Sequence, residues 1–188
     1  MPLDPFSQVY ERIIAILKAD PTLAALVRSA NWITFDAAPQ PLKRAFQPGD
    51  APEILVEPVT GMDQWAETST SAKATVVWSI KIATNDLRLF FTDAAGNASG
   101  VFALKWALIV ALDTAGDGLR SVNSVPALAS LSFCRSSRIV ATVKSPFDPA
   151  GNPVAEARGT DGWTLLATLT TELDLNRDAN GVLVLPNG

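Results

Sequence analysis

Hydrophobic residues recur at helical spacing near the start of the chain. From Pro5 to Lys18 they lie every three or four positions with polar residues between them, which predicts an amphipathic helix with one packed side and one solvated side. We expect Asp4 to cap this helix, because its carboxylate can accept from the first free backbone N–H groups, and Pro5 suits the first helical position. Asp20 and Pro21 repeat this signature, so a second, short helix is predicted directly afterwards.

An alternation of apolar and polar residues predicts the strands. It is clearest from Ala74 to Thr84 and from Trp163 to Leu175, where one face of the sheet should be buried and the other more polar. At about 3.3 Å per residue the last strand would be about 40 Å long, roughly twice the usual length, and so long enough to extend past its own domain. Further strands are predicted at Asn31–Asp36, Glu53–Val59, Leu128–Cys134 and Arg138–Lys144. Between the last two, "RSSR" is either a tight turn or a bulge within one long strand, and we favour the bulge.

The segment Ser99–Thr114, "SGVFALKWALIVALDT", has the length of a helix and is apolar on nearly every side. Ser99 or Asn97 could cap it, and Lys105 is the one charge that interrupts its apolar run. A helix that lies on one sheet keeps a polar stripe toward water, so this helix must also be covered on a second side. The cover is either the first helix of its own chain or a neighbouring subunit. The first option is the more economical, and it predicts that Trp106→Asp unfolds the monomer.

Two long segments without periodicity contain candidate contact residues. Residues 37–51 include Lys43 and Arg44, the only adjacent basic pair of the chain, and long loops of this kind are often functional or involved in assembly. Residues 61–72 form a polar connection that carries Met62 and Trp65. Because an exposed tryptophan forfeits its burial energy, either this loop folds back onto its own domain or Trp65 docks on a partner.

The apolar residues at the end of the chain are a further candidate for contacts. They are Val182, Leu183, Val184 and Leu185. This segment could add as a strand to the sheet edge of a neighbouring molecule, or it could fray as termini often do.

The predicted elements define an α+β fold with a mostly antiparallel sheet of about five strands. N-terminal helices and one central buried helix are expected to pack on that sheet. A chain of 188 residues is expected to form one domain, residues 1–175, followed by a C-terminal extension, residues 176–188.

The composition excludes several kinds of catalytic and metal site. The chain has no histidine and a single cysteine, so histidine-activated nucleophiles, histidine-containing zinc sites and cysteine clusters cannot form within it. The carboxylates are scattered through loops and along polar strand faces, and no glycine-rich phosphate loop or complete calcium loop is present. We therefore expect no catalytic role, no cofactor and no metal. Cys134 lies in the apolar sequence "LSFCRS" and is expected to be a small buried side chain rather than a reactive thiol.

The net charge of -4 and a sequence pI near 4.8 argue against a groove that grips nucleic acid by neutralising phosphates. An acidic surface that lets DNA slide past is compatible with them. No apolar run reaches the ~20 residues that a membrane-spanning helix needs, and the first residues lack the basic start and apolar run of a secretory signal. The sequence thus predicts a cytoplasmic origin and no membrane contact.

The order of the elements resembles that of the tail terminator and tail completion proteins of long-tailed bacteriophages. The resemblance extends from about Phe6 to Leu175 and includes the "PEILVEP" strand, the strand ending near "WSIKIATND", the apolar helix and the final "RGTDGWTLLATLTTELDL" strand. This chain is longer than that pattern, with the extra length in residues 37–51, residues 146–162 and the tail. A neighbouring neck or connector role, or a contractile tail in which the protein also meets the sheath, therefore stays open.

Members of that family are small α+β proteins that form hexameric rings, cap the growing tail tube and join the tail to the head connector. The resemblance implies a structural virion protein of the tail or neck, assembled in the host cytoplasm as a homo-oligomer, with a hexamer expected. Its partners would be the tail tube protein and the head–tail connector protein, and DNA would pass through the ring without specific binding. The alternatives are another connector or minor tail protein, or a monomeric non-viral binding module. The assembly contacts are then expected at Met62, Trp65, Lys43, Arg44, Val182, Leu183, Val184 and Leu185.

Overall fold

Two capped helices open the fold. In the computed structural model, α1 (Pro5–Ala19) begins after Asp4, whose carboxylate accepts from the backbone N–H of Ser7 at 3.0 Å and from its hydroxyl at 2.6 Å. The second helix, α2 (Pro21–Leu26), begins after Asp20, which caps it in the same way. Both predicted caps, each followed by a proline at the first helical position, are confirmed.

The structure describes most of the chain in separate ranges. These are residues 4–27, 32–33, 52–59, 64–84, 91–92, 96, 98–112, 131, 133–145, 147–152 and 163–185.

A curved, mostly antiparallel sheet is the largest element of the described structure. Its strands are β1 (Trp32–Ile33), β2 (Glu53–Pro58), β3 (Gln64–Glu67), β4 (Ser71–Ala83), β7 (Cys134–Lys144), β8 (Thr164–Arg177) and β9 (Leu183–Val184). The central path runs β1-β2-β4-β8-β7, while β3 pairs with β4 and β9 pairs with β8. Only β1 and β2 pair in parallel among these strands. The predicted α+β class is confirmed, but within the described residues this sheet has seven strands rather than about five.

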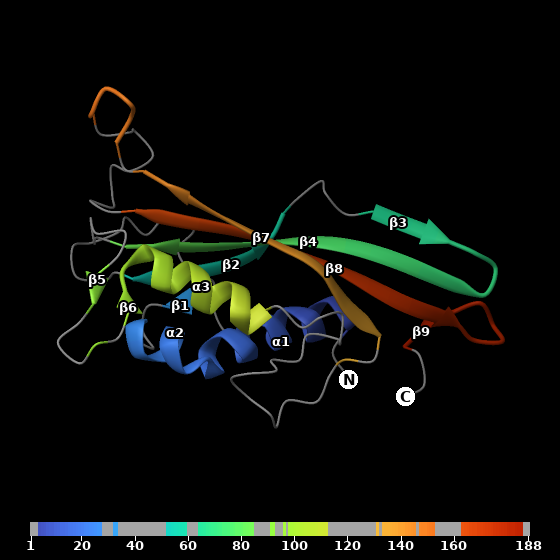
Figure 1. The fold of residues 1–188 in the computed structure, drawn as a ribbon. Coiled ribbons are helices and arrows are strands. Elements are labelled where there is room, and N and C mark those ends of the chain that lie inside the picture. The colour runs from blue at the N-terminus through green and yellow to red at the C-terminus, as the bar shows by residue number, and fades with distance from the viewer. Residues whose placement is uncertain are drawn as a thin grey trace.

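All the described helices lie on one face of this sheet (Figure 1). They are α1, α2 and α3 (Val101–Leu112), and α3 packs against β7 and β8 as well as against both other helices. A separate two-stranded sheet of β5 (Phe91–Thr92) and β6 (Ala98–Ser99) precedes α3. The chain thus forms a layer of helices on a sheet whose other face carries no described helix.

The centre of the sheet follows the predicted alternation. β4 pairs with β8 along all 13 of its residues, from Ser71 opposite Asn176 to Ala83 opposite Thr164. Every predicted inward position of β8 is buried: Leu165, Ala167, Leu169, Thr171, Leu173 and Leu175. The matching positions of β4 are buried too, namely Val76, Trp78, Ile80 and Ile82. The period-two pattern therefore predicted both the strands and their core face.

One polar contact lies inside this core. The indole N–H of Trp78 donates to the hydroxyl of Thr171 at 2.9 Å, and that hydroxyl donates to the carbonyl of Val76 at 3.3 Å. Tyr10 of α1 packs beside the indole with 6.0 Å between ring centroids. Because a buried donor without a partner is costly, this contact explains how a threonine and a tryptophan are accommodated among apolar side chains.

The predicted loop at residues 61–72 contains a strand instead. β3 pairs with the first half of β4, and β2 pairs with the second half on the same edge of that strand. A turn joins β3 to β4. In that turn the N–H of Thr68 donates to the carbonyl of Ser71 at 2.8 Å, and the N–H of Ser71 donates to the hydroxyl of Thr68 at 3.0 Å. All four residues of β3 are exposed, so no alternation marked it in the sequence.

Of the strand predicted at Leu128–Cys134, the structure describes Leu131, Phe133 and Cys134, and only Cys134 among them lies in a strand. β7 begins only at Cys134, whose N–H donates to the carbonyl of Leu131 at 3.0 Å in the turn before it. The register of β7 against β8 shifts between Ser136 and Arg138, so the expected bulge is confirmed. Of the strand predicted at Asn31–Asp36, the described residues are Trp32 and Ile33, which form β1.

The end of the chain folds back onto its own sheet. β8 runs on to Arg177, and β9 pairs with its last residues, Val184 opposite Asn176 and Leu183 opposite Arg177. The turn between them is closed by the Asp178 carboxylate, which accepts from the N–H of Val182 at 2.9 Å. The described part of the tail therefore pairs with its own sheet instead of fraying, and its addition to a neighbouring molecule stays a prediction. The division into residues 1–175 and residues 176–188 stays a prediction.

Candidate interaction surface

The helix α3 turns two aromatic side chains away from the core. It begins after Gly100, which has the positive φ of 92° that suits glycine, and Ser99 lies in β6. One side of α3 is buried, including Leu104, Leu108 and Leu112. Phe102 is 47% exposed and Trp106 is 69% exposed, and residues four positions apart lie on the same side of a helix.

α1 packs against α3, as expected, but this packing does not cover the side that carries Trp106. Both α1 and α2 pack against α3, yet they leave more than two-thirds of Trp106 in solvent. The sequence could not show this, because a helix that is apolar all round does not indicate which side meets its neighbours. The second option, cover by another molecule, stays a prediction.

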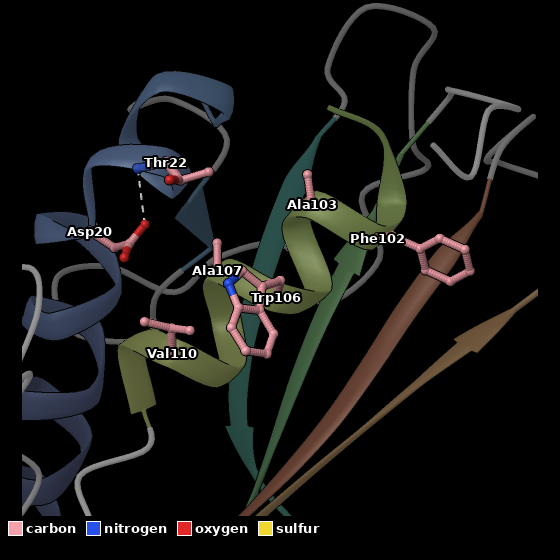
Figure 2. A pocket seen from close by; sticks show the side chains of 7 residues that line it. All are labelled: Asp20, Thr22, Phe102, Ala103, Trp106, Ala107 and Val110. Carbon is pink, nitrogen blue, oxygen red and sulfur yellow. Dashed lines mark hydrogen bonds between the residues drawn. The ribbon is translucent and has the colours of Figure 1, made fainter. Parts of the chain in front are cut away.

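A groove runs between α3 and the junction of α1 and α2. Its volume is about 410 Å³, and its lining residues are Asp20, Thr22, Phe102, Ala103, Trp106, Ala107 and Val110. Figure 2 shows the indole of Trp106 on the outside of α3, with Asp20 and Thr22 on the facing α1–α2 junction. The groove is thus built of apolar and aromatic side chains with a short polar border.

The one carboxylate of the groove already has a structural role. Asp20 accepts from the backbone N–H of Thr22 at 3.0 Å and of Leu23 at 2.9 Å (the former dashed in Figure 2). Asp20 is only 5% exposed, so it is held as the cap of α2. Because two backbone N–H groups hold its carboxylate, Asp20 is poorly placed for acid/base chemistry, which needs a carboxylate free to exchange its proton with a substrate.

The described residues contain no group of three or more histidine, cysteine or acidic side chains that could hold a metal ion. Cys134 is buried, as predicted, and burial raises the pKa of its thiol to about 12, with a smaller contribution from the charge of Asp174. At neutral pH it is therefore protonated and weakly nucleophilic. None of the described helices is long and apolar enough to cross a membrane.

A second candidate surface is the end of the sheet that extends beyond the helices in Figure 1. We call it the arm: residues 64–75 of β3 and β4 and residues 172–185 of β8 and β9. The Arg177 guanidinium holds the arm together, donating to the Glu67 carboxylate at 2.8 Å and to the Gly181 carbonyl at 2.7 Å. The same carboxylate group accepts from the indole N–H of Trp65. These contacts link β3 to the β8–β9 turn across the strands between them.

The predicted contact residues fall into three groups. Trp65, Val182 and Val184 are 45%, 58% and 39% exposed, and all belong to the arm. Leu183 and Leu185 are partly buried, and Leu185 packs against the core. Lys43, Arg44 and Met62 lie outside the described residues. The Glu67–Arg177 contact brings the strand that carries Trp65 next to the end of the chain, a link between residues 110 positions apart that no local pattern predicts.

The sequence interpretation missed Phe102 and Trp106 as surface residues. The one feature that could have indicated them was the lack of any polar stripe on the helix Ser99–Thr114. This feature says that some additional surface must cover the helix, but not which of its residues stay open in the monomer.

In comparisons with known proteins, the chain matches no protein-family model and no curated protein.

Proposed function

We propose that this protein is a structural subunit that assembles with copies of itself into a ring in the tail or neck of a bacteriophage. The observation that carries the proposal is the exposed aromatic side of α3, with Trp106 69% in solvent beside an apolar groove. Exposed apolar patches of soluble proteins are often functional, and one that borders an apolar groove suits a protein contact. The order of the elements, which resembles that of tail terminator proteins, supports the choice of ring and virion.

In this proposal the aromatic patch forms the centre of an interface, because it is too small to be the whole of one. Taking ~200–250 Å² for a complete aromatic side chain, Phe102 and Trp106 together expose about 270 Å². A stable interface takes about 800 Å² from each partner. Tryptophan and its neighbours often act as the anchors around which such an interface closes, so further surface must join them.

The arm offers that further surface. It carries exposed Trp65, Val182 and Val184 on strands, and it lies away from the helix layer that carries the groove. Two different contact surfaces on one chain favour a head-to-tail contact, in which one surface of each copy meets the other surface of the next. Contacts of this kind close into rings when the rotation between copies closes, which is the assembly proposed here.

The remaining parts of the proposal come from the resemblance and from the charge. The ring would cap the tail tube, contact the tube protein on one side and the head–tail connector protein on the other, and let DNA pass. A net charge of -4 would suit a passage that does not hold DNA. In this proposal the protein is not an enzyme and needs no cofactor.

Sedimentation velocity over a wide concentration range, with electron microscopy of the associated species, tests the proposal. Association into closed rings by the wild-type chain supports it, and the loss of those rings in Trp106→Asp would assign the contact to α3. Val140→Asp is the matched control, because Val140 is also exposed but lies on β7, outside both candidate surfaces. A wild-type chain that stays monomeric at high concentration and alongside purified tail tubes would overturn the proposal and leave the monomeric binding module.

A further inference from the structure

We draw no further inference here: the strongest candidate, the apolar groove between α3 and the α1–α2 junction, belongs to the interaction surface already described, and nothing in the structure shows which segment or partner covers it.

Discussion

Replacing Trp106 by aspartate separates the stability of the monomer from its assembly. Because the side chain is 69% exposed, about a third of its ~250 Å² is buried, or about 80 Å². At about 25 cal/mol per Å² the lost burial amounts to about 2 kcal/mol, which is an upper estimate because unfolded chains also bury some apolar surface. Single domains have unfolding free energies of about 5–15 kcal/mol, so Trp106→Asp is expected to remain folded.

The same substitution two positions later in α3 provides the control. Leu108 is fully buried, so Leu108→Asp loses about 2–3 kcal/mol of burial and also places a carboxylate without a partner in the core. This second cost adds several kcal/mol, and the variant is expected to be unfolded or to keep its carboxyl protonated. Comparing the two variants tests the orientation of α3 in the monomer.

The assay is urea unfolding followed by far-UV circular dichroism, which does not depend on the tryptophan that the mutation removes. We expect a cooperative transition for Trp106→Asp with a free energy of unfolding at most about 2 kcal/mol below that of the wild type. Sedimentation velocity on the same samples should show the loss of the self-association that we propose for the wild-type chain.

Two results would refute the reasoning. If Trp106→Asp is unfolded where the wild type is folded, Trp106 is covered by its own chain in solution and the exposed aromatic side does not exist. If the variant is folded and still forms rings, the α3 side takes no part in the assembly contact and the arm must account for it without α3.

Three further predictions concern the interior and the caps. Thr171→Val removes the acceptor of a buried indole N–H and should lower the free energy of unfolding by about 1–3 kcal/mol in urea titrations. The control Thr168→Val, on the other face of β8, should change it by less than ~0.5 kcal/mol. Equal effects of the two substitutions would contradict the buried contact. Hydrogen bonds from the Ser7 hydroxyl and backbone hold the pKa of Asp4 below 3.8. The charged form of Asp4 therefore contributes stability that is present above that pH and is lost as the pH falls through the folded pKa. The difference in unfolding free energy between wild type and Asp4→Asn should shrink under strong acid, and a difference that does not depend on pH would argue against this role. Because burial raises the pKa of Cys134 to about 12, iodoacetamide at mildly alkaline pH should label it only as the chain unfolds, and labelling of the folded protein at the rate of a free thiol would show that it is accessible.

The sequence predicted the elements that depend only on residues close to one another in the chain. Asp4 and Asp20 each precede a proline and cap a helix, because a carboxylate at that position accepts from N–H groups only two or three residues away. The alternation along β4 and β8 predicted their buried faces, since side chains of a strand point alternately to its two sides. These parts of the fold and its α+β class follow from the order of residues along the chain.

The tertiary structure alone decided the elements that depend on distant partners. β3 and β9 are short and mostly exposed, and they form strands because β4 and β8 offer free backbone groups beside them. No periodicity within four exposed residues could predict that pairing, and the Glu67–Arg177 contact depends on it. The arm therefore could not be derived from the sequence, although Trp65 and Val182 were predicted as contact residues.

The helix α3 shows where the sequence stops determining the structure. Its sequence established a helix, apolar on all sides, that needs more cover than one sheet provides. Which side stays open was decided by how α1, α2 and the sheet pack around it, and this packing leaves Phe102 and Trp106 in solvent. A helix that is apolar on all sides does not indicate which side is buried. Only the positions of the neighbouring elements decide which of its side chains remain exposed and form a candidate interaction surface.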